Sequence, residues 1–170
     1  MITLTSYFIY SQIFVFNAMI FDFLAFQFKK RKYIFLCLII STCLISIHYF
    51  FLNKIAAAVI LIFSAIRFIT YYFTEDKRYL YLFIALNIIS LFFTYKEIYD
   101  LIICTGTIIF IIGMMQKEDK LMREIMMISM AMAITYNIII FSPMGIIAET
   151  SVLISNLLGY YRHHIKLSPV

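Results

Sequence analysis

The sequence predicts an all-α integral membrane protein whose seven transmembrane helices form two parallel three-helix bundles joined by a linker helix. Three observations predict this fold. Of the 170 residues, 64% are hydrophobic and only 14% are charged, whereas a soluble domain is about half apolar and a quarter charged. The apolar residues fall into seven long runs, and the first three runs resemble the last three. The lipid bilayer is therefore the expected partner of most of the surface.

The seven runs favour helices over strands. A helix needs about 20 residues to cross the hydrocarbon core, and somewhat fewer suffice. A membrane β-barrel would instead alternate apolar and polar residues in strands of about ten. These runs are continuously apolar, so helices are predicted. The predicted spans are Tyr7–Phe28, Tyr33–Leu52, Ile55–Thr74, Tyr79–Tyr95, Ile98–Met115, Leu121–Phe141 and Gly145–Tyr161.

Each span is bounded by charged or turn-forming residues. The first is longer than the apolar core of a signal peptide, and MITLTSYF supplies neither a basic region nor a cleavage site, so it is expected to remain as a span. Tyrosines, which suit the membrane interface, begin and end the fourth span. The breaks are too short to hold a soluble catalytic unit or a nucleotide-binding loop. They are 29–32, 53–54, 75–78, 96–97, 116–120 and 142–144.

The Lys and Arg residues predict the orientation, because they accumulate in cytoplasmic loops. Eleven fall on one side of the predicted spans and two, Lys54 and Lys96, fall on the other. We therefore expect the N-terminus outside and a cytoplasmic C-terminal tail at 162–170. The eleven are Lys29, Lys30, Arg31, Lys32, Lys77, Arg78, Lys117, Lys120, Arg123, Arg162 and Lys166.

The composition argues against several other functions. The net charge of +5 comes from inter-span loops, so it does not indicate nucleic-acid binding. Cys37, Cys43 and Cys104 lack CxxC spacing and are odd in number, which favours packing over a disulfide or a metal site. No nucleophile–base pair, metal-ligand cluster or phosphate loop is visible. We expect no enzyme activity, no cofactor and no metal.

The first three spans (7–74) and the last three spans (98–161) align with each other as an internal repeat. With an offset of 88 residues, Ser41 falls on Ser129 and His48-Tyr49 falls on Tyr136-Asn137. Beyond the next turn we expect an offset of 92, which places Ser64 on Asn156.

The remaining segment, Tyr79–Tyr95, has no counterpart. An extra span between two three-span units gives both units the same orientation, which makes this segment the linker helix. Parallel repeats of this kind build one class of alternating-access carrier. The linker's amide, Asn87, is expected to bond a neighbouring helix.

Polar residues within the spans are the candidates for a binding site. Ser41 and His48 share a face of the second span, and Ser129 and Tyr136 share a face of the sixth. Such stripes either pack helices together or line a cavity. His48 is consistent with a buried hydrogen-bonded side chain, an interfacial group or a ligand contact.

Two charged residues add to these candidates. Glu149 shares a face with Asn156, and the pair either contacts a polar solute or consists of a headgroup-level carboxylate and a helix-packing amide. Arg67 lies about two turns before the cytoplasmic end of its span. It is expected to snorkel to the surface, and the alternative is a pair with an anionic solute or with Asp22.

The stretches HYFF…SAIRF (His48–Phe68) and YNIIIFSPMGIIAETSVLISN (Tyr136–Asn156) resemble the bacterial YgjV family of inner-membrane proteins. The sequence departs from that family at Ser64, where the family has Asn, and at Tyr136, where it has His. The resemblance implies a bacterial inner (plasma) membrane location. The 3+1+3 organisation is similar to the SWEET sugar facilitators and the PnuC vitamin transporters, which implies a central site near Ser64 and Asn156.

These observations predict a facilitator or secondary carrier for an unidentified small polar solute, working by alternating access. The alternative is a non-transporting membrane assembly factor or partner subunit with a transporter-like fold, and a homo-oligomer is compatible with both. The candidate substrate-binding residues are Asn156, Ser64, Glu149, His48, Asn137, Tyr136 and Arg67.

Overall fold

The computed structural model describes residues 2–27, 31–74, 76, 78–116, 118–161 and 164. These residues form seven α-helices and no strand, which confirms the predicted all-helical chain. Each helix coincides with one predicted span, and the ends differ by at most the five residues by which α1 begins early. The helices are α1 (Ile2–Gln27), α2 (Arg31–Phe51), α3 (Ile55–Phe73), α4 (Arg78–Thr94), α5 (Asp100–Met114), α6 (Asp119–Ile139) and α7 (Pro143–Tyr160).

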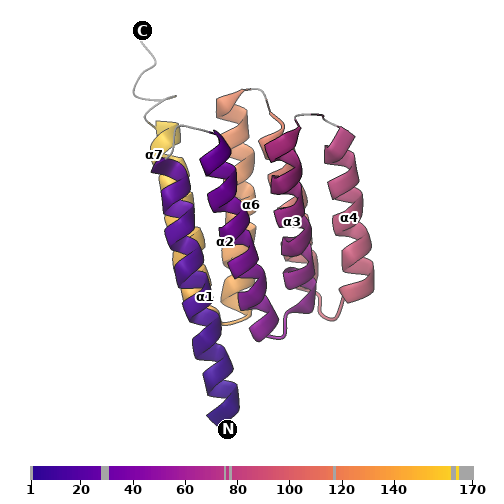
Figure 1. Ribbon diagram of the computed structural model, residues 1–170, viewed down its shortest axis with the longest axis vertical. Helices are drawn as coiled ribbons and strands as arrows, with labels where there is room; N and C mark the ends of the chain where they lie inside the picture. The colour runs from indigo at the N-terminus through magenta and orange to yellow at the C-terminus, as the bar shows by residue number, and fades with distance from the viewer. Residues whose placement is uncertain are drawn as a thin grey trace.

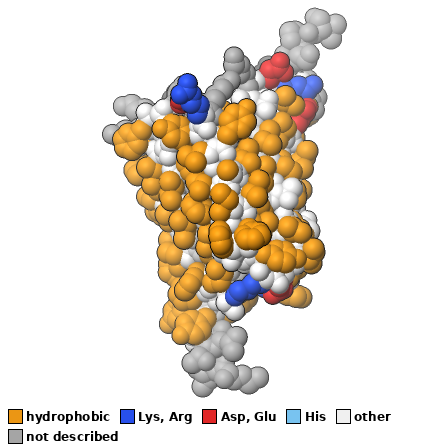
Figure 2. Space-filling model, turned by 90° about the vertical axis from the view of Figure 1, so that its right-hand side faces the viewer, with side chains coloured by type: hydrophobic (Ala, Val, Ile, Leu, Met, Phe, Trp, Pro, Cys, Tyr) orange, Lys and Arg blue, Asp and Glu red, His pale blue; other side chains and the backbone are white. Residues whose placement is uncertain are grey.

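The outer surface of the bundle is apolar. Figure 2 shows hydrophobic side chains over the middle of the molecule and charged side chains near its two ends. Large side chains such as Phe73 (80% exposed) and Phe92 (81%) face outward. By length and composition, two stretches of the described helices, Ser6–Ala25 and Ile55–Phe73, can cross a membrane. The seven-span arrangement therefore stays a prediction.

The helices form two rows of three with α4 at one edge (Figure 1). Along the chain, α1, α2 and α3 pack in succession, and so do α5, α6 and α7. The rows join at both edges, where α1 packs against α7 and α3 packs against α5. Helix α4 packs against both α3 and α5. The predicted linker therefore contacts both halves of the molecule.

Small residues let the helices approach closely within each row. Ala18 and Ala57 are fully buried. The Ser129 hydroxyl donates to the Gly106 carbonyl of α5 across 2.8 Å, and the Ser46 hydroxyl donates to the Ala58 carbonyl of α3 across 2.8 Å. Both serines act as packing groups between helices, and for Ser129 this is one of the two roles that the sequence left open for its polar stripe.

The linker helix buries Phe83, Asn87 and Ser90. The Asn87 amide donates to the Phe83 carbonyl of its own helix, across 2.7 Å. The prediction that this amide bonds a neighbouring helix is therefore wrong. The carbonyl four residues earlier lies within reach of any short polar side chain on a helix, so it competes with partners on other helices.

The α2–α3 and α6–α7 turns have the same backbone geometry. Asn53 (φ 58°) and Phe141 (φ 55°) both adopt the left-handed conformation. The Lys54 N–H donates to the Tyr49 carbonyl across 2.9 Å, and in the second turn the Ser142 N–H donates to the Asn137 carbonyl, also across 2.9 Å. Corresponding positions in the two turns differ by 88, since 142 − 54 = 137 − 49 = 88.

The matched turns correct the expected alignment. Helices α3 and α7 begin at Ile55 and Pro143, which are also 88 residues apart. The offset of 92 is therefore wrong where these helices start, because the second turn contains no inserted residue. With an offset of 88, Ser64 corresponds to Val152 and no longer to Asn156.

Phe141 offers a test of backbone strain in the second turn. A non-glycine residue in the left-handed region costs roughly 1 kcal/mol or more, and Asn tolerates this region best. Phe141 is 82% exposed, so its side chain makes few contacts to lose. We expect Phe141→Asn, which copies Asn53, to stabilise the detergent-solubilised protein by about 1 kcal/mol.

Thermal unfolding of the purified protein measures this effect. The matched control is Phe92→Asn, because Phe92 is equally exposed but lies in regular helix. A gain of stability in the control, or none in Phe141→Asn, would contradict the explanation by strain.

Candidate functional site

The structure distributes the candidate residues over four places. His48, Tyr136 and Asn137 lie where the ends of α2 and α6 meet. Glu149 lies on α7 near α1, and Asn156 lies further along α7 against α6. Ser64 and Arg67 lie on α3.

His48 is a buried, hydrogen-bonded connector between the two halves. Its Nδ1–H donates to the Ser11 carbonyl of α1 across 2.8 Å. A carbonyl only accepts, so this contact places the proton on Nδ1 and leaves Nε2 as an acceptor. The Ser142 hydroxyl donates to Nε2 across 3.0 Å and accepts the Gly145 N–H of α7 across 3.2 Å. Of the three roles open to His48, the structure shows the buried hydrogen-bonded one.

A second contact holds the start of α7 against α1. The Gln12 amide oxygen accepts the Met144 N–H across 3.0 Å, and its NH₂ group donates to the Ser11 hydroxyl across 3.0 Å. Sequence reasoning missed Ser11 and Ser142. Ser142 could have been predicted as a helix N-cap, because serine is favoured at the N-cap and proline at the next position, N1.

Tyr49 and Asn137 meet between α2 and α6. The Tyr49 hydroxyl donates to the Asn137 side-chain oxygen across 3.1 Å, and the Asn137 NH₂ group donates to the Ala133 carbonyl across 3.0 Å. The Tyr136 ring packs edge-on against Tyr49, with ring centres 5.5 Å apart. The buried Tyr136 hydroxyl has no hydrogen-bond partner among the described residues.

Two carboxylates, Asp22 of α1 and Glu149 of α7, lie in the region where α1, α2 and α7 adjoin, which we call the carboxylate wedge. The Asp22 carboxylate accepts a hydrogen bond from Ser41. Glu149 is half-buried and interacts electrostatically with Asp22 and Tyr49. Within the described part of the chain, no hydrogen bond to the Glu149 carboxylate is found. These two carboxylates are the acidic groups best placed to take up a proton or a cation within the bundle.

A small cavity adjoins this wedge. Its volume is about 10 Å³, which is close to the space that one water molecule occupies. No group of three or more His, Cys, Asp or Glu side chains that could hold a metal ion occurs in the described ranges. The cavity is lined by Met19, Asp22, Phe23, Ser151, Val152 and Ser155.

Asn156 packs α7 against α6. Its NH₂ group donates to the Arg123 carbonyl across 3.0 Å, and its oxygen accepts from the Arg123 guanidinium across 3.3 Å. The Ser64 hydroxyl donates to the Ile60 carbonyl of its own helix across 3.1 Å. Helix α3 packs against α2, α4 and α5, whereas α7 packs against α1 and α6. The structure therefore does not bring Ser64 and Asn156 together.

Arg67 is buried in the bundle and is only 2% exposed. The expectation that it snorkels to the surface is therefore wrong. Its guanidinium lies over the rings of Phe68, at 5.0 Å, and Phe110 of α5, at 5.6 Å. These rings attract the cation and hold it inside.

Gly145 provides a test of the contact between α6 and α7. A Cβ atom at this position would lie 2.7 Å from the Asn137 Cγ and 2.7 Å from the Ser142 Oγ. Both side chains are short and hydrogen-bonded, so neither can move away easily. We expect Gly145→Ala to destabilise the protein by about 1–3 kcal/mol, measured by thermal unfolding.

Gly159→Ala is the matched control in the same helix. A Cβ atom there would meet the end of the flexible Arg123 side chain, which can shift. Equal losses of stability in the two variants would contradict a specific role for the Asn137 contact.

The comparisons with known proteins identify the family. One family profile, Imp-YgjV, described as a bacterial inner membrane protein, matches residues 9–166. The comparison with curated proteins and the comparison with solved structures each gave no match. The profile covers most of the chain, including both halves and the turns between their helices. The chain therefore belongs to the Imp-YgjV family of bacterial inner membrane proteins.

Proposed function

We propose that this inner membrane protein is a facilitator or secondary carrier for a small polar solute. In this proposal all seven helices span the bilayer. The two three-helix bundles, α1–α3 and α5–α7, move against each other in alternating access, and α4 links them. The observation that carries the proposal is the pair of matched turns, whose backbone hydrogen bonds correspond at an offset of 88 residues.

The packing of the helices supports a parallel repeat. Consider a two-fold axis that exchanges α1 with α5, α2 with α6 and α3 with α7. Such an axis requires that a contact between α1 and α7 be matched by a contact between α5 and α3, and both contacts are present. Tyr49 and Asn137 are equivalent under this exchange, and they bond each other. Residues that lie near a two-fold axis contact their own equivalents. Parallel repeats about an axis along the membrane normal are one architecture of secondary carriers.

The carboxylate wedge supports a polar solute or a coupled cation. Ionisable residues within membrane segments are costly and commonly mark solute or ion pathways. Glu149 has unused acceptor capacity, and it lies at the edge where α1 of one bundle meets α7 of the other. Movement of the two bundles would therefore change the surroundings of this carboxylate directly.

Uptake into proteoliposomes tests the proposal. We expect at least one solute from a panel of sugars, vitamins, nucleosides and amino acids to accumulate above the level of empty liposomes. Glu149→Gln should lower uptake to that background, because it removes the charge while keeping the shape. Glu118→Gln, at an exposed carboxylate outside the wedge, is the control and should retain full uptake. Background uptake for the whole panel would defeat the carrier proposal.

A second candidate function is a non-transporting assembly factor or partner subunit. The polar side chains of His48, Asn137 and Asn156 bond other parts of the protein, and the cavity beside the wedge has a volume of about 10 Å³, room for one water molecule. Such a closed interior suits a structural role. Co-purification of one stoichiometric partner, together with normal function of Glu149→Gln, would favour this candidate.

The orientation of the chain can be tested separately. Figure 1 shows that α1, α3 and α5 end, and α2, α4 and α6 begin, at the same end of the bundle. We propose that this end is cytoplasmic, because the sequence predicts eleven Lys and Arg residues on this side of the spans and two on the other. In a cysteine-free background, Lys96→Cys should react with an impermeant maleimide in intact cells, and Arg78→Cys should react only after lysis. The reverse labelling pattern would invert the topology.

A further inference from the structure

Arg67 is a buried cation, and two of its three donor nitrogens lack acceptors. Its Nε and Nη1 atoms are enclosed and have no hydrogen-bond partner among the residues that the structure describes. An arginine remains charged in proteins, so it cannot avoid this cost by losing a proton. A buried charge without a paired group is strongly unfavourable. The site therefore has an unmet requirement for an acceptor.

The aromatic neighbours of Arg67 do not meet this requirement. The Phe68 and Phe110 rings attract the positive charge through their faces. They supply no lone pairs, however, and a guanidinium directs five N–H groups outward in its plane. Oxyanions such as carboxylate and phosphate match that planar fork of donors.

The Tyr71 hydroxyl, one helical turn further along α3, is another buried hydrogen-bond donor without an acceptor. The residue is 8% exposed, and its enclosed hydroxyl has no hydrogen-bond partner within the described ranges. Positions i and i+4 lie on the same face of a helix, so Tyr71 and Arg67 are neighbours. The two side chains do not satisfy each other, because Arg67 Nε and Nη1 and the Tyr71 hydroxyl all remain unpaired.

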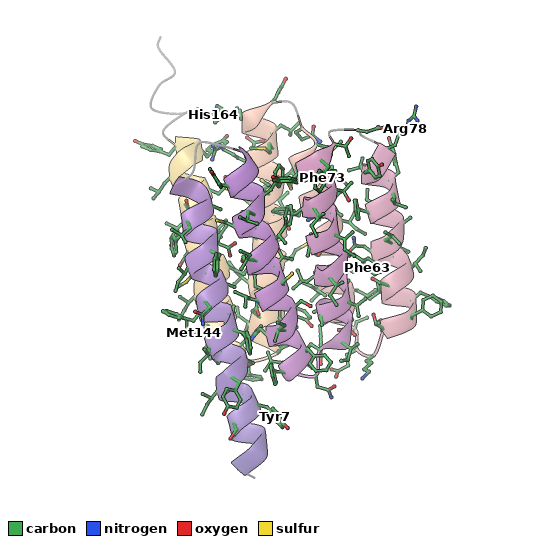
Figure 3. All side chains as sticks on the ribbon, in the orientation of Figure 1. Tyr7, Phe63, Phe73, Arg78, Met144 and His164 are labelled. Atoms are coloured by element: carbon green, nitrogen blue, oxygen red, sulfur yellow. The ribbon has the colours of Figure 1, made fainter. Side chains whose placement is uncertain are left out.

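The site lies near the basic end of the bundle. Arg67 is six residues before the end of α3, which corresponds to about 9 Å along the helix axis. Figure 3 shows Phe73, at the end of α3, and Arg78, at the start of α4, at this same end. The sequence-based orientation expects eleven Lys and Arg residues on this side of the spans. Such a concentration of positive charge attracts anions.

We propose that Arg67 and Tyr71 form a binding site for a compact oxyanion that enters between the helices from the basic end. The guanidinium binds two oxygens of a phosphate or carboxylate group, and the Tyr71 hydroxyl donates to the same group. The Phe68 and Phe110 rings keep the guanidinium in place. This inference goes beyond the proposed carrier function and does not require transport. The oxyanion is either free in solution or the phosphate of a lipid headgroup.

Anion-dependent stabilisation of the purified protein tests the site. The unfolding temperature of the full chain in neutral detergent is measured against inorganic phosphate, with sodium chloride at equal ionic strength as the reference. We expect a saturable rise for the wild-type protein that Arg67→Met abolishes, because Met keeps an unbranched apolar stem without the charge. Tyr71→Phe keeps the ring and should raise the half-saturating phosphate concentration by about fivefold.

A matched control and a lipid experiment complete the test. Arg78→Gln removes an exposed cation at the same end and should leave the phosphate response unchanged. Comparing nanodiscs of phosphatidylglycerol with nanodiscs of phosphatidylcholine distinguishes the two sources. Stabilisation by phosphatidylglycerol alone that depends on Arg67 assigns the site to a lipid headgroup. The proposed site is wrong if neither inorganic phosphate nor phosphatidylglycerol stabilises the wild-type protein. It is also wrong if Arg67→Met and Tyr71→Phe respond to these anions as the wild-type protein does.

The result is separable from the carrier proposal. Anion binding without uptake of any solute would leave the site in place and remove the carrier. Uptake without any anion effect would leave the carrier and remove the site.

Discussion

The hydrogen bonds of His48 fix how the two halves of this protein meet. One ring nitrogen binds the Ser11 carbonyl, and the other accepts the Ser142 hydroxyl, which also caps α7. The start of α7 is thereby held against α1 and α2, and Gln12 strengthens that contact. With α7 in place, Gly145 packs on Asn137, and Asn137 is held in position to accept the Tyr49 hydroxyl. In an apolar environment each of these polar groups needs its partner, so the set specifies one packing arrangement.

The charged side chains Asp22, Arg67 and Glu149 in the interior differ in the partners that they have. Asp22 receives a hydroxyl, Arg67 is held by aromatic rings, and Glu149 keeps unused acceptor capacity. The side chains of His48 and Asn156, which join helices, are paired within the chain. Among the described residues, buried side-chain atoms of Arg67, Tyr71, Asn87 and Tyr136 have no partner, and Arg67 is the one of these that carries a charge. That contrast is the reason to separate residues that hold the fold from residues that are available to a ligand.

The sequence predicts the helices well because long apolar runs with short polar breaks have few other solutions in a bilayer. It predicts side-chain partners less well. Asn87 turns to its own backbone, and Arg67 stacks on rings from two helices, which depends on tertiary contacts that spacing does not reveal. The presumed equivalence of Ser64 and Asn156 fails because apolar helices align at several offsets. The backbone hydrogen bonds of the turn at Phe141 match those of the turn at Asn53 at an offset of 88 residues and not 92.

The position of α4 gives the molecule two unlike edges. At one edge, α3 and α5 contact each other and are both buttressed by α4, with Phe83, Asn87 and Ser90 buried. At the other edge, α1 meets α7, and the hydrogen bonds of His48 and Gln12 reinforce this contact at the start of α7. The first edge is therefore braced along its helices by a third helix, whereas the second is tied by hydrogen bonds at the start of α7. A separation of α1 from α7 would meet least restraint beyond these bonds, where Asp22 and the small cavity lie.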